Sequence, residues 1–306
     1  MTGKVGRRLS RSLLHIVIIS ICLMWTLPSF GLLANSFRSR RDIVATGWWK
    51  ALKTPFAFTV ENYMDVLTGQ SHYGEEKASD KSRSILGDII TGQGIGRAFL
   101  NSLVISIPST LIPVVIASFA AYALAWMRFP GRDLLLVIVV GLLVVPLQMT
   151  LIPILRFYKG LHLAGTFLGV WLAHTAYGLP YAIYLLRNFF KALPRDLFES
   201  ASLDGASQFV VFYRIVVPLS IPAIASLAIF QFLWVWNDLL VALIYLGGTR
   251  DVAPLTMHIS SMMSSLGENW HLLPAGAFIS MMLPLIIFST LQPYFVRGIL
   301  AGSLKG

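Results

Sequence analysis

The chain has 306 residues, of which 56% are apolar and only 12% charged, and its mean hydropathy is +0.72. Soluble domains carry about 25% charged residues, so this composition excludes an ordinary soluble domain and indicates a polytopic membrane protein. The apolar runs are long and continuous rather than alternating, which favours helices over a β-barrel, because backbone polar groups must be paired within the bilayer. We therefore predict an all-α membrane fold.

The formal charge of +10 comes mainly from Lys and Arg at the ends of the apolar runs, where they set topology and meet anionic lipid. No basic helix with an aromatic platform accompanies it, so we expect no nucleic-acid partner. The single cysteine, Cys22, excludes an intrachain disulfide and a cysteine metal cluster. Neither H-E-x-x-H nor G-x-S-x-G occurs, so the sequence shows no hydrolase or metal motif.

The apolar pattern predicts six transmembrane helices. We expect them at residues 12–37, 98–126, 133–158, 163–190, 216–246 and 273–296. The basic start resembles a signal peptide, but its apolar run reaches Phe37 without a cleavage site, so we predict an uncleaved first span. Residues 1–11 and 298–306 are then terminal tails, 38–97 a long loop, and 98–297 the core of the protein.

The distribution of positive charge predicts that both termini are cytoplasmic. With that orientation the inside segments carry 12 Lys and Arg, and the two short outside loops carry 3. The loop 38–97 is then extracytoplasmic, although its basic residues next to the first span oppose this orientation. Its stretch 58–67 has helical apolar spacing with Thr59 as a cap, and a polar, glycine-containing insert follows at about 68–97.

Between the fourth and fifth spans lies a polar segment, residues 191–215, that predicts two short helices. Pro194 and Asp196 suit the start of the first helix, and Gly205 suits a left-handed end. Ser207 can cap the second helix, which has one apolar face. Small residues and two acids, Glu199 and Asp204, surround the turn. From the residues alone this segment is either a docking surface for another protein or an ordinary helix–turn–helix connection.

The same segment, "ESASLDGASQFVVFYRIVVPLSIP", resembles the EAA motif of ABC-importer permeases. The matching positions are Glu199, Ala201, Asp204, Gly205, Ala206, Phe212, Ile215, Pro218 and Pro222. Ser200 stands where the family usually has alanine. Further stretches, such as "AAYALAWMRFPGR", "LPYAIYLLRNFF" and the tail "YFVRGILAGSLKG", extend the resemblance over nearly the whole chain. They are similar to carbohydrate-importer permeases related to the six-span maltose subunit.

The resemblance implies a multi-pass subunit of the cell inner membrane that forms half of a sugar pathway. Its implied partners are a homologous second permease, two ATPase subunits that bind ATP and Mg²⁺, an extracytoplasmic solute-binding protein and the lipid bilayer. The chain has no G-x-x-x-x-G-K-[ST] motif, so it is expected to be neither an ATPase nor a cofactor-binding protein. The residues implied to couple to the ATPase are Glu199, Ser200, Ala201, Leu203, Asp204, Gly205, Ala206 and Phe212. The tail residues Ser303 and Lys305 are either a further ATPase contact, as the resemblance implies, or part of a frayed terminus.

Polar and aromatic groups within the spans are candidates for the solute path, because polar groups are costly in a membrane and aromatic rings stack on sugars. The candidates are Asn237, Trp234, Tyr177 and Gln148. Asn237 and Asp238 also suit a structural pair between helices, which is the more common role of such a pair, and His174 suits a satisfied interior residue. Prolines within the predicted spans are candidate bend points, namely Pro108, Pro113, Pro146, Pro153, Pro180 and Pro284.

Two other functions stay open from the sequence. An ABC importer for another small solute, such as glycerol phosphate, would share the same architecture. An ion-coupled secondary transporter needs intramembrane charges, and Asp238 is the only acid in the later spans.

Overall fold

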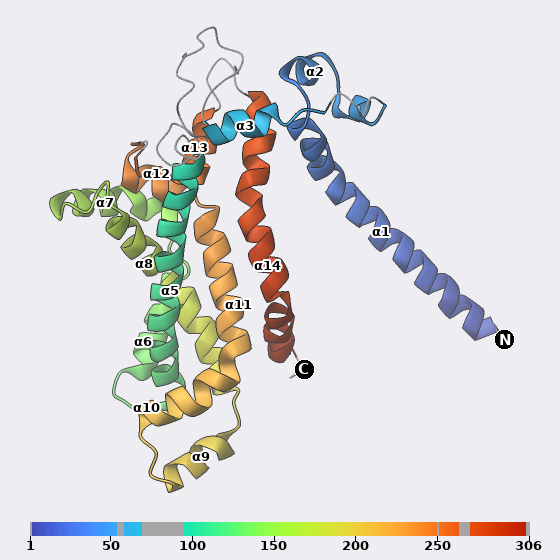
Figure 1. The fold of residues 1–306 in the computed structure, drawn as a ribbon. Coiled ribbons are helices and arrows are strands. Elements are labelled where there is room, and N and C mark those ends of the chain that lie inside the picture. The colour runs from blue at the N-terminus through green and yellow to red at the C-terminus, as the bar shows by residue number, and fades with distance from the viewer. Residues whose placement is uncertain (1, 54–57, 69–94, 250, 263–269, 304–306) are drawn as a thin grey trace. The chain divides into compact units, whose positions relative to one another are not determined.

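The computed structural model describes residues 2–53, 58–68, 95–249, 251–262 and 270–303 (Figure 1). Every regular element among them is a helix, apart from one isolated bridge between Arg38 and Phe58. The all-α prediction is confirmed. The chain forms two compact units, one of residues 1–96 with 261–279 and one of residues 97–260 with 280–306.

Four helical stretches of the described chain are long and apolar enough to cross a membrane, or five if one bent pair counts as a span. The four are Ser12–Ser36 of α1 (Thr2–Ser36), α5 (Ile95–Trp126), Gln208–Trp236, and Trp270–Pro293, which includes most of α14 (Leu273–Ser303). Helix α8 (Phe167–Lys191) has 25 residues but carries polar groups along its length and is not among them. The count of six spans stays a prediction.

The predicted span 133–158 is wrong as a single helix. It is divided into α6 (Arg132–Leu142) and α7 (Leu147–Gly160), which are bent by 102° at the break. Pro146 immediately precedes α7 and has no backbone N–H, and the residue before a proline disfavours the α conformation. These two local restrictions account for the interruption of an otherwise continuous apolar run.

The predicted span 216–246 is also interrupted. Helix α11 (Val217–Trp236) ends before Asn237, and a separate helix, α12 (Leu240–Leu246), follows. The carboxylate of Asp238 accepts a hydrogen bond from the backbone N of Ala242 at 3.1 Å, so it occupies a free donor at the start of α12. Short acidic and amide side chains favour helix ends because they bond nearby backbone groups.

In the first unit, polar side chains hold the chain that follows α1. The guanidinium of Arg38 is only 4% exposed and donates to Asp42 O at 2.8 Å and to Asn35 Oδ1 at 3.0 Å. Asn62 donates to the carbonyl of Arg38 at 2.7 Å. Arg38 is therefore a buried structural cation rather than a free surface charge. The elements held here are α2 (Arg40–Ala45), the 3₁₀ turn η1 (Trp48–Leu52) and α3 (Glu61–Thr68).

Helix α3 confirms the helix predicted within 58–67, with its start at Glu61. The hydroxyl of Thr59 accepts a hydrogen bond from Glu61 N at 3.1 Å, as expected for a cap. Most of the polar insert, residues 69–94, lies outside the described residues. The remaining described elements are the short turn η4 (Trp270–Leu272) and α13 (Leu255–Met262).

The second unit has two apolar cores along α8. One core lies toward the C-terminal end of α8, where Leu186 and Phe190 pack with residues of α5 and α11. The other lies toward its N-terminal end, where Val170 packs with Tyr245 of α12. Helix α8 therefore takes part in both cores, and it contacts α6, α11 and α12.

Candidate functional site

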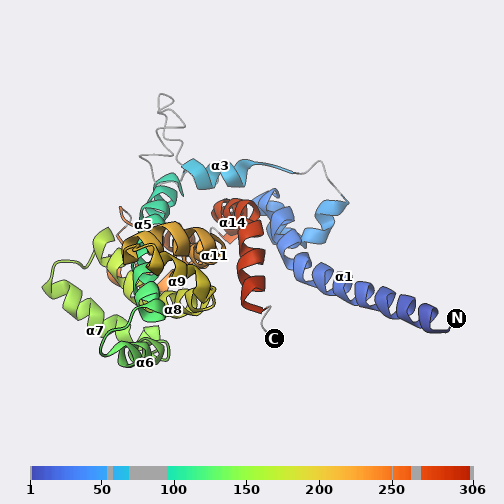
Figure 2. The same ribbon diagram turned by 90° about the horizontal axis from the view of Figure 1, so that it is seen from below.

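The polar segment between α8 and α11 forms a helix, a turn and a second helix, as predicted. Helix α9 (Arg195–Leu203) is followed by a turn and by α10 (Gln208–Val211). Helix α10 is not a separate element, because it continues through a π-helical stretch, η3 (Phe212–Val216), into α11. Figures 1 and 2 show α9 across the end of the unit, beneath α8 and α11. We call residues 191–215 the coupling segment, after the role that the family resemblance implies.

A glycine in the left-handed conformation ends α9. Gly205 has φ +70°, and its N–H donates to Ser202 O at 3.1 Å. The next N–H, of Ala206, donates to Ala201 O at 2.9 Å. These two bonds form a Schellman motif, which satisfies the last carbonyls of the helix. The hydroxyl of Ser207 then accepts from Val210 N at 3.5 Å and caps α10, so both predicted turn devices are present.

The predicted coupling residues divide into an exposed and a buried set. Leu203 is 89% exposed, an unusual position for a large apolar side chain in a polar turn. Ala201 is 7% and Phe212 3% exposed, so these two shape the segment from inside rather than face a partner. Ala206 is half-buried. The exposed members of the set are Glu199, Ser200, Leu203, Asp204 and Gly205.

Aromatic contacts that the sequence analysis missed attach this segment to α5. The ring of Phe198 lies flat on Trp126, with centroids 3.6 Å apart and planes inclined by 17°. The indole N–H of Trp126 donates to Phe190 O at 2.9 Å, near the C-terminal end of α8. Phe212 stacks on Phe119 of α5 with centroids 4.7 Å apart. In the sequence, this contact was indicated only by a tryptophan at the end of a predicted span, Trp126, and by an aromatic residue next to Glu199, Phe198.

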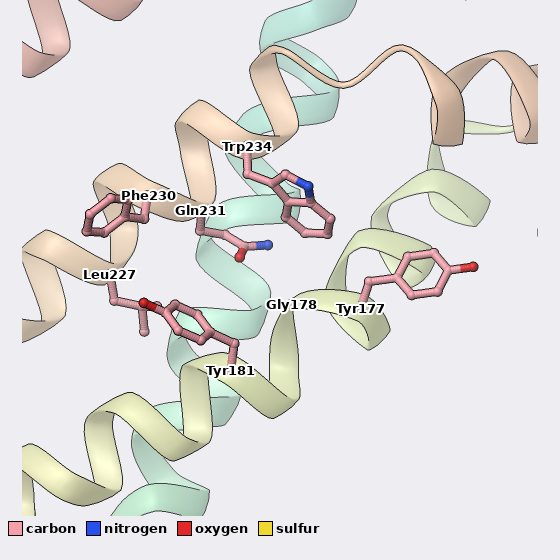
Figure 3. Close-up of a pocket in the computed structure, with 7 residues that line it drawn as sticks. All are labelled: Tyr177, Gly178, Tyr181, Leu227, Phe230, Gln231 and Trp234. Carbon is pink, nitrogen blue, oxygen red and sulfur yellow. The ribbon is translucent and has the colours of Figure 1, made fainter. Parts of the chain in front are cut away.

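A pocket of about 370 Å³ lies between α8 and α11, the two helices that flank the coupling segment (Figure 3). Four of its lining residues are aromatic and one carries a carboxamide. They are Tyr177, Gly178, Tyr181, Leu227, Phe230, Gln231 and Trp234. Ring faces with a few polar groups are the usual composition of a small-molecule site.

Two of the four predicted path residues, Tyr177 and Trp234, line this pocket. The hydroxyl of Tyr177 points away from the other lining side chains in Figure 3. It is within hydrogen-bond distance of Thr150 Oγ1, at 2.9 Å, and of Tyr245 Oη, at 2.8 Å. Tyr177 therefore contributes ring surface to the pocket, and its hydroxyl joins α8 to α7 and α12.

The other two predicted path residues are not among the lining residues. Asn237 is exposed, and its amide donates to Leu233 O of its own helix at 2.7 Å. Gln148 is exposed on α7. Of the predicted tail contacts, Ser303 is the last residue of α14 and Lys305 lies outside the described residues.

Gln231 carries the carboxamide of the pocket and is among the five lining residues that the sequence analysis missed. Its Nε2 donates to Ser109 O of α5 at 3.2 Å. A Cβ on Gly178 would lie 2.6 Å from that nitrogen, so only glycine at this position leaves room for the carboxamide. The available signal was a glutamine inside an apolar run, since polar groups within spans are rare and functional.

His174 lies behind the pocket wall. It is fully buried, and its ring meets Trp234 edge-on with centroids 5.1 Å apart. Its Nε2 lies 3.8 Å from Asp238 Oδ2, too far for a hydrogen bond. The prediction of an interior histidine is confirmed by this burial, and neither ring nitrogen has a protein hydrogen-bond partner among the described residues.

Residues 113–300 match the family described as "Binding-protein-dependent transport system inner membrane component". The chain belongs to this family. The match includes the coupling segment and every residue that lines the pocket. The permease is thus an inner-membrane transport subunit, and the family resemblance is confirmed.

Relatives of the permease extend over almost its whole length. It is 58% identical to the osmoprotective compounds uptake permease protein GgtD of Synechocystis sp., over 95% of this chain and 91% of the relative. It is 43% identical to the alpha-glucoside transport system permease protein AglG of Rhizobium meliloti, over 95% and 96%. It is 30% identical to the arabinooligosaccharides transport system permease protein AraQ of Bacillus subtilis, over 97% and 96%.

A solved bacterial ABC transporter that imports the acidic polysaccharide alginate has the same fold. Its chain is 18% identical and has a TM-score of 0.70, over 95% of this chain and 98% of that one. The inward-facing MetNI methionine ABC transporter is 17% identical with a TM-score of 0.52, over 66% and 94%. These likenesses show the fold, and the family match together with the named relatives identifies the permease as part of an ABC importer.

Proposed function

We propose that the permease forms half of the translocation pathway for a sugar or oligosaccharide and that its coupling segment docks on a cytoplasmic ATPase. In this proposal a homologous second permease completes the pathway. Two ATPase subunits bind ATP and Mg²⁺, and an extracytoplasmic solute-binding protein delivers the sugar. The single observation that carries the proposal is the location of the pocket, between the two helices joined by the coupling segment.

The chemistry of the pocket supports a carbohydrate. Rings of Tyr181, Phe230 and Trp234 supply flat apolar surface, which suits the C–H faces of a sugar. The carboxamide of Gln231 can both donate to and accept from hydroxyl groups. None of the seven lining residues is Lys or Arg, the side chains that bind phosphate with paired, charge-assisted hydrogen bonds. The pocket thus favours a neutral polyol over glycerol phosphate.

The exposed part of the coupling segment supports docking on another protein. Leu203 presents an apolar side chain that is 89% exposed, and the acids Glu199 and Asp204 lie on either side of it in the sequence. A central apolar group surrounded by charges is the usual arrangement of a protein contact. The Schellman turn and the Phe198 contact make the segment stiff, so it can transmit a displacement instead of absorbing it.

The test is ATP hydrolysis by the importer assembled with its partner subunits and binding protein. We expect stimulation by a binding protein loaded with trehalose, sucrose or an arabinose oligosaccharide, and none by one offered glycerol 3-phosphate. Uptake on an ion gradient in vesicles that lack the ATPase would refute the proposal, and so would stimulation by glycerol 3-phosphate alone.

A second candidate solute class is osmoprotective compounds, because the GgtD protein, 58% identical, is named for their uptake. Osmoprotectants include neutral glycosides and zwitterions, and the pocket composition favours the former. Including glycine betaine in the same assay separates the two classes, since stimulation by glycine betaine and not by any sugar would assign the permease to zwitterionic osmolytes.

A further inference from the structure

Prolines within α5 and α14 free specific backbone carbonyls. Proline has no N–H, so the carbonyl four residues earlier loses its helical partner. Pro108 and Pro113 in α5 leave the carbonyls of Val104 and Ser109 without that bond, and Pro284 in α14 leaves the carbonyl of Ser280. In a membrane-spanning helix such a group must find another partner, because lipid offers none.

Each of these three carbonyls accepts a hydrogen bond from a side chain of another helix. The indole N–H of Trp171 in α8 donates to Val104 O at 2.9 Å. The amide of Gln231 in α11 donates to Ser109 O at 3.2 Å. The indole N–H of Trp236, also in α11, donates to Ser280 O at 3.1 Å. The correspondence holds at all three proline positions named above.

Two of the three donors, Trp236 and Gln231, are buried and placed by packing. Trp236 is 2% exposed, and its ring packs against Phe99 and Phe232, each with a centroid distance of 5.5 Å. Gln231 is 5% exposed and reaches α5 across Gly178, where a side chain would block it. Carbonyls inside a regular helix are already occupied, so a donor from a second helix finds an acceptor mainly where proline has removed the first.

We propose that Trp171, Gln231 and Trp236 are positioning residues that clamp proline-freed carbonyls and thereby tie α5 and α14 to α8 and α11. Helices α8 and α11 carry the coupling segment between them. A displacement of that segment is therefore transmitted through the clamps to the proline positions, the points at which a helix bends most readily. This last step rests on the proposed function, whereas the pairing of each clamp with its own proline does not.

The pairing is tested by a crossed set of double variants in the assembled importer. Pro113→Ala restores the N–H that Ser109 O lacks, so it removes the need for Gln231 but not for Trp171. Pro108→Ala does the reverse. Gln231→Leu and Trp171→Phe delete the donors while keeping most of the side-chain volume. Each donor deletion is made in the wild-type, Pro108→Ala and Pro113→Ala backgrounds, and the midpoint of thermal unfolding, Tm, is measured.

We expect Gln231→Leu to lower Tm by about 2 to 6 °C, because a buried acceptor is left unpaired. The loss should fall below half of that value with Pro113→Ala and stay unchanged with Pro108→Ala. Trp171→Phe should show the opposite pattern. If a donor deletion lowered Tm equally in the Pro108→Ala and Pro113→Ala backgrounds, the pairing of each donor with its own proline would be refuted. If a Pro→Ala variant does not assemble, amide hydrogen exchange of the α5 peptide in Gln231→Leu tests the proposal instead. Exchange should rise around Ser109, and unchanged exchange would count against the proposal.

Transmission is tested with MgATP as the only ligand. We expect MgATP to change amide exchange around Ser109 in the wild-type complex and to have less than half of that effect in Gln231→Leu. A purely structural role would shift the baseline exchange and leave the MgATP response intact, which would overturn transmission. No response in the wild type would refute both transmission and the proposed ATPase coupling. The Tm values of the double variants would still test whether each donor is paired with its own proline.

Discussion

Phe198 of α9 lies flat against Trp126 at the end of α5, with ring centroids 3.6 Å apart. Through the indole N–H of Trp126 the same contact reaches Phe190 O at the end of α8. The coupling segment is therefore attached to two helices by one pair of rings.

The first prediction concerns that attachment. Phe198→Ala removes the stacked pair, and stacked aromatic pairs contribute about 0.5 to 1.5 kcal/mol beyond the burial of the ring. We expect amide hydrogen exchange in α9 to rise roughly tenfold. Phe209→Ala is the matched control, because Phe209 is 69% exposed and belongs to the adjacent helix. Unchanged exchange in Phe198→Ala would show that α9 is held by other contacts.

The second prediction concerns Gly205, whose φ is +70° and where a Cβ would have no atom within 4 Å. Gly205→Ala therefore adds backbone strain without a clash, and we expect a loss of about 1 kcal/mol of stability. In thermal unfolding this is a fall in Tm of about 2 to 4 °C. Gly141→Ala is the control, because it lies within α6 in open space and should be neutral or stabilising. Equal Tm values for the two variants would contradict the role of Gly205.

The third prediction separates docking from folding. Leu203→Asp changes a side chain that is 89% exposed, so Tm of the permease should stay within about 1 °C of the wild type. Its binding to the ATPase should weaken at least tenfold, about 1.4 kcal/mol, because a charge replaces the central apolar group. Ser202→Asp adds the same charge at the neighbouring exposed position and should weaken binding less. Co-purification with the ATPase measures both, and equal effects would refute a specific role for Leu203.

The fourth prediction distinguishes two residues of the pocket. The hydroxyl of Tyr177 bonds to Thr150 and Tyr245, away from the pocket, so Tyr177→Phe should lower Tm by about 2 to 4 °C and leave solute affinity unchanged. Trp234→Leu removes a ring from the wall and should raise the half-saturating sugar concentration roughly tenfold. Uptake of labelled trehalose or sucrose measures the solute affinity of both variants, and thermal unfolding measures Tm. The reverse pattern would place the Tyr177 hydroxyl on the solute.

The fifth prediction joins Gly178 to Gln231. A Cβ at residue 178 would lie 2.6 Å from Gln231 Nε2, the end of a flexible side chain, so the carboxamide moves and its bond to Ser109 O is lost. Gly178→Ala should thus lower Tm about as much as Gln231→Leu, and the double variant should lose little more than either. Additive losses would mean that Gly178 serves a separate contact.

The sequence alone established the fold class, the family resemblance and the local geometry of the coupling segment. Helix periodicity, the glycine at 205 and the cap at Ser207 are short-range features, because each depends on hydrogen bonds between residues a few positions apart. For the same reason α3 and its Thr59 cap were predictable. Hydropathy did not show the interruption at Asn237, because that residue lies within a continuously apolar run. Pro146 was a candidate bend point in the sequence, and the structure shows a complete break between α6 and α7 there.

Only the tertiary structure decided which side chains meet. It placed Phe212 inside the unit and Leu203 outside, it turned the Tyr177 hydroxyl away from the pocket, and it brought Gln231 to Ser109 across 122 residues of chain. The prolines of α5 already indicate in the sequence that two carbonyls need new partners. Which donors reach them depends on the packing of α8 and α11 against α5, and no local pattern records that long-range proximity.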